Sequence, residues 1–320
     1  MDLSNSETTP SDIIMRYYSN NAPFRSTFYR QAFPFRDTLI RYITNNPASS
    51  KLYQKIIQSC KHFFIKNPII IVRELRFEEE NCYIRGSRPS KDRPNYRSVD
   101  LNELTSKIWI TDSFKVWGRT PNCPVITSFM PQIYQCNATD IFIYKQMFSF
   151  NDLMIIASKC ELLHLSNVVI MNNDEVAPET EKDQFYFETA VSLETLFTAL
   201  PKVKKFTYYL PDNSLNIITT KTAVELLKIP HFLSLDQFKI GKIPEIFDIK
   251  SFYCHIKKNK KTKIHLDFSD RICDEYKTRL QTIVDEILEK ENRNYKVPWI
   301  YFPRITNSSR EKMHDLYRQI

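Results

Sequence analysis

Residues 235–268 read LDQFKIGKIPEIFDIKSFYCHIKKNKKTKIHLDF. An apolar strand at 235–240 precedes a helix-period apolar stripe at 249–257, and a second alternating strand follows at 263–268. One strand and one helix of this length cannot bury their apolar sides alone, so such a unit must stack on similar neighbours. The stretch therefore predicts an α/β fold in which strands lie side by side and helices pack on them.

The same unit recurs through the second half of the chain. Strands are predicted at 141–144, 162–165, 206–209, 235–240, 263–268 and 299–302, and helices at 151–158, 193–199, 221–227, 249–257 and 274–291. Several strands start roughly 20 to 30 residues apart, the spacing of leucine-rich repeats, in which one strand and one helix form each turn. We therefore predict a right-handed, leucine-rich-repeat-like strand–helix solenoid over residues 131–304. An acidic stretch near 172–189 is interpreted as an insertion into it.

The N-terminal part of the chain has a different pattern. Residues 1–26 are polar and without periodicity, which predicts a flexible tail. Leu39, Tyr42 and Ile43 fall on one helix face, and a second apolar stripe runs over 52–64, so residues 27–68 are predicted to form a helical hairpin. Connecting strands with a long polar loop at 77–103 are expected over 69–130, and a C-terminal tail or helix over 305–320.

Glycine is rare, and this excludes several enzyme classes. The chain has only three glycines, so it cannot build the clustered-glycine loops that hold nucleotide phosphates. Six histidines and seven cysteines show neither zinc-ligand spacing nor a C-x-x-C pair, and no nucleophile motif is present. We expect a non-enzymatic protein with reduced thiols and without a metal or cofactor.

Positive charge raises the question of nucleic-acid binding. The formal net charge is +8, and a basic patch is formed by Lys257, Lys258, Lys260, Lys261 and Lys263. We interpret this run as a solvated loop rather than a phosphate-binding surface. The basic and aromatic stretch 204–209 contains residue types that stack on bases, but we assign it to a strand of the core and of a concave face. Nucleic acid is therefore the less favoured partner.

The sequence also bears on location. It contains no apolar run of the length that a membrane-spanning helix needs, and its N-terminus lacks the basic start and apolar centre of a secretory signal. We expect a cytoplasmic or nuclear protein that does not interact with membranes.

Two short N-terminal segments resemble a known family. Residues 33–40 read FPFRDTLI and residues 59–64 read SCKHFF, which are similar to the opening and the second half of an F-box. The downstream segments 199–203, 227–233 and 243–247 are similar to a nematode-expanded family of F-box-like proteins with divergent leucine-rich-type repeats. The resemblance covers residues 28–302. Phe33 stands where the family has leucine, and the segment between the two helices is altered.

The resemblance implies a partner and a role. F-box proteins are substrate receptors of cullin–RING ubiquitin ligases and dock a Skp-type adaptor through apolar helix positions. By position the adaptor-binding residues would be Phe33, Pro34, Leu39, Ile40, Ile43, Ile56, Ile57 and Phe63. The alternatives are a stand-alone repeat scaffold, in which the hairpin only caps the array and the strand face binds a protein, and a basic nucleic-acid-binding protein. The identity of the protein target is not encoded in any motif.

Overall fold

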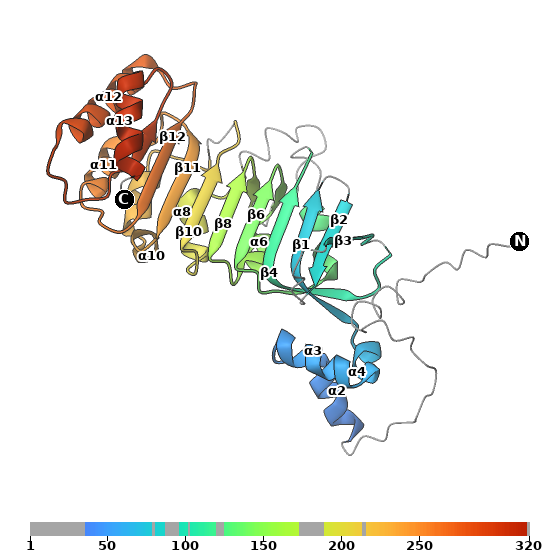
Figure 1. Cartoon of the computed structure of the whole chain (residues 1–320). Coiled ribbons are helices and arrows are strands. Elements are labelled where there is room, and N and C mark those ends of the chain that lie inside the picture. Colours follow the sequence, from blue (N-terminus) through green and yellow to red (C-terminus); the bar gives the residue numbers. More distant parts are fainter. Residues whose placement is uncertain are drawn as a thin grey trace, which may run out of the picture.

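The computed structural model describes residues 36–78, 81–86, 96–101, 103–119, 125–172, 189–212 and 216–318. It is a mixed α/β structure with a mostly parallel sheet that does not close into a barrel within these residues (Figure 1). Three short N-terminal helices, here called the helical unit, precede the sheet: α2 (Asp37–Asn45), α3 (Ser50–Ser59) and α4 (Lys61–Lys66).

The sheet has the strand order β13-β12-β11-β10-β8-β6-β4-β1-β2-β3, with β5 also paired to β4. Its strands are β1 (Ile69–Glu78), β2 (Asn81–Gly86), β3 (Tyr96–Val99), β4 (Lys107–Trp117), β5 (Ile133–Cys136), β6 (Asp140–Tyr144), β8 (Leu162–Ser166), β10 (Lys205–Tyr209), β11 (Gln237–Ile243), β12 (Lys263–Phe268) and β13 (Trp299–Tyr301). β5 aside, each strand of this sheet from β4 to β13 pairs in parallel with the next one along the chain. The strands predicted from the sequence are thus confirmed as neighbours in one sheet.

Helices lie behind the strands in Figure 1, so one face of the sheet is covered. They are α5 (Val125–Phe129), α6 (Phe150–Ala157), α8 (Leu193–Ala199), α9 (Thr222–Lys228), α10 (Pro230–Leu233), α11 (Ile249–Ile256) and α12 (Asp274–Glu289). The last helix, α13 (Asn307–Arg318), instead lies in front of the sheet at its β12–β13 end, where its Tyr317 ring is 6.1 Å from the His265 ring of β12. A small second sheet pairs β7 (Met147–Ser149) with β9 (Val169–Met171). The predicted helices 151–158, 193–199, 221–227, 249–257 and 274–291 are each present within a few residues.

Strand alternation decides which side chains enter the core. In β10, for example, Phe206 and Tyr208 are buried while Lys205, Thr207 and Tyr209 retain exposure. Because side chains point to opposite faces in turn, one face of every strand from β4 to β12 packs against the helices. We call the other face the open face. Only alternate residues are needed for the core, so the remainder are available for contacts outside the chain.

Two local predictions need correction. Residues 77–103 are predicted as a loop, but β2 and β3 lie within this span and extend the sheet: β2 pairs antiparallel with β1, and β3 pairs antiparallel with β2. The second helical stripe, 52–64, is predicted as one helix, but the backbone is extended at Cys60 (φ −153°, ψ 123°), which separates α3 from α4. The 1–26 tail and most of the 172–189 insertion lie outside the described residues, whereas α13 answers the choice between tail and helix at 305–320.

The helical unit packs on the sheet through a small apolar cluster. Tyr53 of α3 is fully buried against Ile69 and Ile71 of β1 and Trp109 of β4, and Ile57 adds to this contact. The pairing of β1 shifts register between Val72 and Glu74, so the side chains before and after this bulge exchange faces. As a result the open face is covered by α3 at the N-terminal ends of β1 and β4 and is uncovered beyond the bulge.

Candidate functional site

A continuous row of side chains crosses the open face. Strand register places one residue from each of eight strands in line; we call this set the central row: Arg76, Lys115, Phe142, His164, Thr207, Lys239, His265 and Trp299. Neighbouring members are about 5 Å apart because that is the spacing of paired strands. None of them is an acid, and each is partly exposed.

Aromatic rings join the central row to the row beside it. Trp117 stacks on Phe142 with centroids 4.8 Å apart, and Phe142 lies 4.6 Å from the His164 ring. The ring of Tyr209 follows at 6.0 Å from His164. At one end the Arg76 guanidinium lies 4.7 Å from the Trp117 ring, within cation–π distance. Trp, Tyr and Arg are the residues that most often dominate binding energy at protein interfaces.

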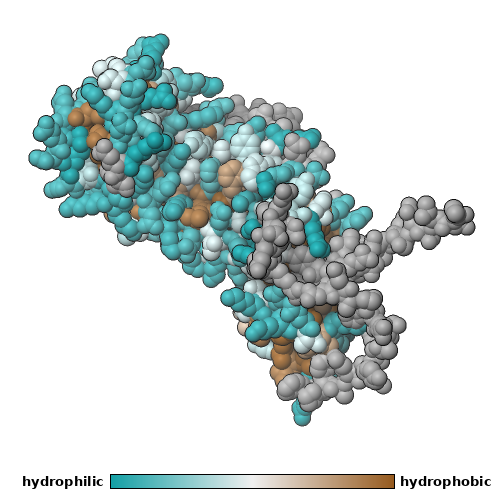
Figure 2. All heavy atoms as spheres, viewed as in Figure 1, coloured by the Kyte–Doolittle hydropathy of each residue, from teal (hydrophilic) through white to brown (hydrophobic). Residues whose placement is uncertain are grey.

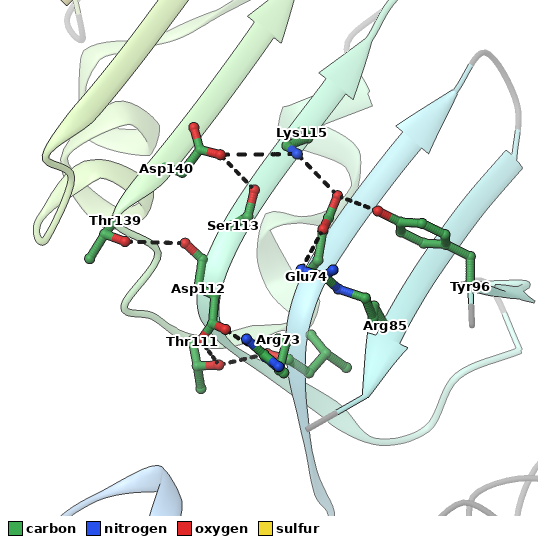
Figure 3. Close-up of polar contacts among 11 residues, drawn as sticks. Arg73, Glu74, Arg85, Tyr96, Thr111, Asp112, Ser113, Lys115, Thr139 and Asp140 are labelled. Carbon is green, nitrogen blue, oxygen red and sulfur yellow. Dashed lines mark hydrogen bonds and ion pairs between the residues drawn. The ribbon is translucent and has the colours of Figure 1, made fainter. Parts of the chain in front are cut away.

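Charges at the β1–β4 end of the open face are paired within the chain (Figure 3). Glu74 is only 2% exposed, and its carboxylate lies 3.0 Å from Arg85 and 3.3 Å from Lys115, while the Tyr96 hydroxyl donates to it at 2.9 Å. Such pairing is what a buried carboxylate requires. Figure 3 also shows Lys115 directed toward Asp140, the next acid across the sheet, at 4.0 Å. The charged side chains named at this end of the open face are therefore paired with one another within the chain.

The β10–β12 end is different. Within the described part of the chain, Lys205, Lys239 and Lys263 have no carboxylate oxygen within 4.0 Å. The Lys239 ammonium lies 5.1 Å from the centroid of the Tyr209 ring. That ring in turn lies across Gly241, where an added Cβ would come within 2.4 Å of Tyr209 Cδ1. Glycine therefore allows the tyrosine to lie flat on the sheet beneath the lysine.

The imidazoles of the central row are neutral at physiological pH. Burial, followed by the nearby Lys239 ammonium, lowers the pKa of His265 to about 3. The same two causes lower the pKa of His164, against a smaller opposite effect of Asp140. A neutral imidazole carries one N–H donor and one acceptor nitrogen. The fixed positive charge in this part of the row therefore belongs to Lys239.

A second surface lies on the helical unit. Large apolar side chains are exposed there: Leu39 (43%), Tyr42 (67%), Leu52 (47%) and Ile65 (62%). Figure 2 shows brown, hydrophobic atoms gathered on this unit, at the lower right. Of the predicted adaptor-binding residues, Leu39 is exposed, Ile43, Ile56 and Phe63 are partly exposed, Ile40 is buried, and Ile57 packs against the small cluster. Phe33 and Pro34 lie outside the described residues.

The lysines of the predicted basic patch do not form one surface, because their side chains contact different parts of the fold. Lys257 lies 3.3 Å from Glu286 of α12, and Lys261 contacts Asp236 before β11 at 3.5 Å. Lys263 is on the open face, where its ammonium lies 4.3 Å from the Tyr317 ring. Lys258 and Lys260 are exposed. The turn between them is held by buried Asn259, whose Oδ1 accepts from the Thr262 amide at 2.9 Å.

No group of three or more His, Cys, Asp or Glu side chains in the described ranges is placed to hold a metal ion. The described cysteines are free, and burial raises the pKa of the Cys82, Cys136 and Cys160 thiols to about 12. Such thiols are poor nucleophiles. No helix in the described part is long and apolar enough to cross a membrane.

Comparisons with protein-family models, with curated proteins and with solved structures found no match for this chain. Its function must therefore be argued from the two surfaces just described.

Proposed function

We propose that this chain is a non-enzymatic protein receptor that holds a protein partner on the open face of its sheet. The observation that carries this proposal is the central row with its joined aromatic rings, which no described helix covers from β4 to β10 (Figure 1). Half-buried aromatic and cationic side chains that are not needed by the core resemble the anchors of protein interfaces.

The sheet topology supports a repeat architecture for this receptor. Parallel pairing of each strand with the next, with helices on one face, is what a right-handed solenoid of leucine-rich-repeat type would produce. In such an array each repeat contacts only its neighbours, and these contacts stabilise an extended open face that can bind a partner. We include this architecture in the proposal.

The experiment compares the partners of matched variants by affinity purification and mass spectrometry. Trp117→Ala/Tyr209→Ala removes two rings of the open face, whereas Val224→Asp/Ile246→Asp alters exposed apolar residues outside it. We expect partners of the wild type to be lost only with the first variant, because loss of interface aromatics commonly costs about 2 kcal/mol or more each. If every partner is retained, the proposal is wrong.

A second candidate function concerns the helical unit. Four large apolar side chains exposed on a unit of three short helices favour a further protein contact there. In accord with the F-box resemblance, we propose that this surface docks a Skp-type adaptor of a cullin–RING ubiquitin ligase, which would make the chain a substrate receptor. The stand-alone scaffold is the alternative in which this surface has no ligase partner.

The adaptor test uses exposed residues only. Leu39→Asp/Leu52→Asp places charge on the exposed surface, whereas a change at Ile57 would also damage the small cluster. The control is Ile155→Asp, which changes an exposed residue of α6. We expect a purified Skp-type adaptor to bind the wild type and this control with equal affinity, and to bind the double variant at least about tenfold more weakly. Failure of the wild type to bind would leave the scaffold as the function.

A further inference from the structure

We propose that the β10–β12 part of the open face is a carboxylate-binding site that selects an acidic, extended segment of the protein partner, with Lys239 as its centre. This inference rests on the proposed function and specifies which residue type the partner presents to the open face. It concerns Lys205, Lys239 and Lys263 together with the donors that surround Lys239.

The position of Lys239 suits a carboxylate. Its ammonium is held 5.1 Å from the Tyr209 ring centroid, and in the described part of the chain it forms no ion pair within 4.0 Å, although the Asp267 carboxyl interacts with it over a longer distance. Thr207 and His265 flank it in the central row, and in the described part of the chain neither side chain has a hydrogen-bond partner. The Lys239 ammonium, the Thr207 hydroxyl and the single N–H of the neutral His265 imidazole can each donate to a carboxylate. The partly buried Asp267 of β12 lies on the same face and is within the electrostatic reach of Lys239.

The charge distribution selects an acidic partner. Cations of the β1–β4 end are already paired, Lys115 with Glu74 and Arg76 with Glu78. In the β10–β12 part, Lys205 and Lys263 face the same way as Lys239 and are separated by Gln237 in the register. These two lysines are therefore about 10 Å apart. Alternate carboxylates of an extended peptide can reach cations at such a spacing.

A peptide fits this face better than a nucleic acid does. A phosphate backbone carries charge at every nucleotide and needs a continuous track of cations. Here the cationic part is followed across the sheet by Asp140, whose side chain is 44% exposed and which would repel a long polyanion. A peptide can place acids beside the three lysines and apolar or aromatic residues beside Phe142 and Trp117.

Fluorescence anisotropy with short labelled peptides tests the site. The probes are a glutamate–tyrosine alternating peptide, the same peptide with glutamine for glutamate, and oligouridine RNA. The proteins are the full chain, Lys239→Met, and the control Lys258→Met, which removes an exposed lysine of the neighbouring basic run. Methionine retains the apolar stem, and thermal unfolding confirms that each variant is folded.

We expect the glutamate peptide to bind the wild type and Lys258→Met with the same affinity and to bind Lys239→Met about five- to tenfold more weakly. Added salt should lower the affinity of the peptide for the wild type. Equal affinity of the glutamate and glutamine peptides, or an unchanged affinity of Lys239→Met, overturns the site. So does absence of peptide binding, or tighter binding of the RNA in competition. If both peptides bind equally and both are lost with Tyr209→Ala, the open-face receptor survives and only its acidic partner is wrong.

Discussion

The Tyr209 ring packs closely against Gly241 on the open face. An alanine Cβ at 241 would lie 2.4 Å from Tyr209 Cδ1 and 2.8 Å from Cε1, which is closer than carbon atoms can approach. The glycine has no positive φ angle, so its role here is steric and not conformational. One of the three glycines in the chain is thus used to lay a ring flat beneath Lys239.

Gly241→Ala is therefore expected to displace the Tyr209 ring and to lower the free energy of unfolding by about 1 to 3 kcal/mol, as overpacking usually does. Urea unfolding measures the change. In a Tyr209→Ala background the added methyl meets no ring, so the same substitution should cost less than about 0.5 kcal/mol. Equal costs in both backgrounds would contradict the contact.

His265 makes stability depend on pH. Its pKa in an unfolded chain is about 6.5, and burial with the Lys239 ammonium lowers the folded value to about 3. Between these values the unfolded chain binds a proton that the folded chain does not, so stability is lost as the pH falls from 6.5 towards 3. His265→Gln should remove about 1 to 2 kcal/mol of the stability difference between pH 7 and pH 5, measured by urea unfolding. If the stability difference between pH 7 and pH 5 were the same in the wild type and in His265→Gln, His265 would not be its cause.

Glu74 and Glu78 provide a matched pair of carboxylates on β1. Glu74 is 2% exposed between Arg85 and Lys115, whereas Glu78 is 41% exposed and pairs with Arg76 alone. We expect Glu74→Gln to destabilise the fold by about 2 to 3 kcal/mol because it removes the carboxylate beside the partly buried Arg85 and leaves Lys115 with only Asp140, 4.0 Å away. Glu78→Gln should cost less than about 1 kcal/mol. Chemical denaturation of both variants decides whether the difference exists.

At the scale of elements, periodicity predicted the second half well and the region before it poorly. Each strand from 141 onward alternates or is apolar, and each helix has a stripe, so burial and sequence agree. The sequence of β2 and β3 predicts a loop because both strands are short and charged and lie at a sheet edge, where one face is solvated. The break at Cys60 has no proline or glycine to signal it.

The C-terminal helix α13 covers the last strand of the sheet. Its His314 and Tyr317 rings pack on Trp299 of β13, and Met313 is fully buried. A helix in this position protects the edge strand, whose free backbone groups would otherwise be available to another chain. The sequence predicts either a tail or a helix at 305–320 because the mean hydropathy of this stretch is low and few of its residues face the core.

Met313→Ala tests this covering role. Removing a fully buried methionine should lower the free energy of unfolding by about 2 to 4 kcal/mol and should promote self-association, since the edge opens more often. Denaturation and light scattering measure the two effects. The control Lys312→Ala, an exposed neighbour on the same helix, is expected to change stability by less than about 0.5 kcal/mol. A stable, monomeric Met313→Ala would show that the helix is dispensable.

At the scale of the whole molecule, the central row could not have been predicted. Alternation within 205–209 indicates which residues leave the core, and these residues do lie on the open face. Their alignment with Arg76, Phe142 or Trp299 depends on register between strands far apart in sequence, and no local pattern encodes that register. Adaptor binding through the helical unit stays a prediction, and the packing of Ile57 against β1 and β4 follows from a contact between helix and sheet that no local pattern encodes.

The two proposed surfaces should act independently. The helical unit contacts the sheet at the N-terminal ends of β1 and β4, whereas Lys239 lies on β11, four strands from β4 and five from β1, and thus about 19 to 24 Å across the sheet. Variants at such a separation usually add within about 0.5 kcal/mol. We therefore expect Lys239→Met to leave adaptor affinity within about twofold, and Leu39→Asp/Leu52→Asp to leave glutamate-peptide affinity equally unchanged. Titration calorimetry with each ligand, alone and in the presence of the other, measures both affinities. If one variant lowered the affinity for both ligands, the two surfaces would be energetically coupled.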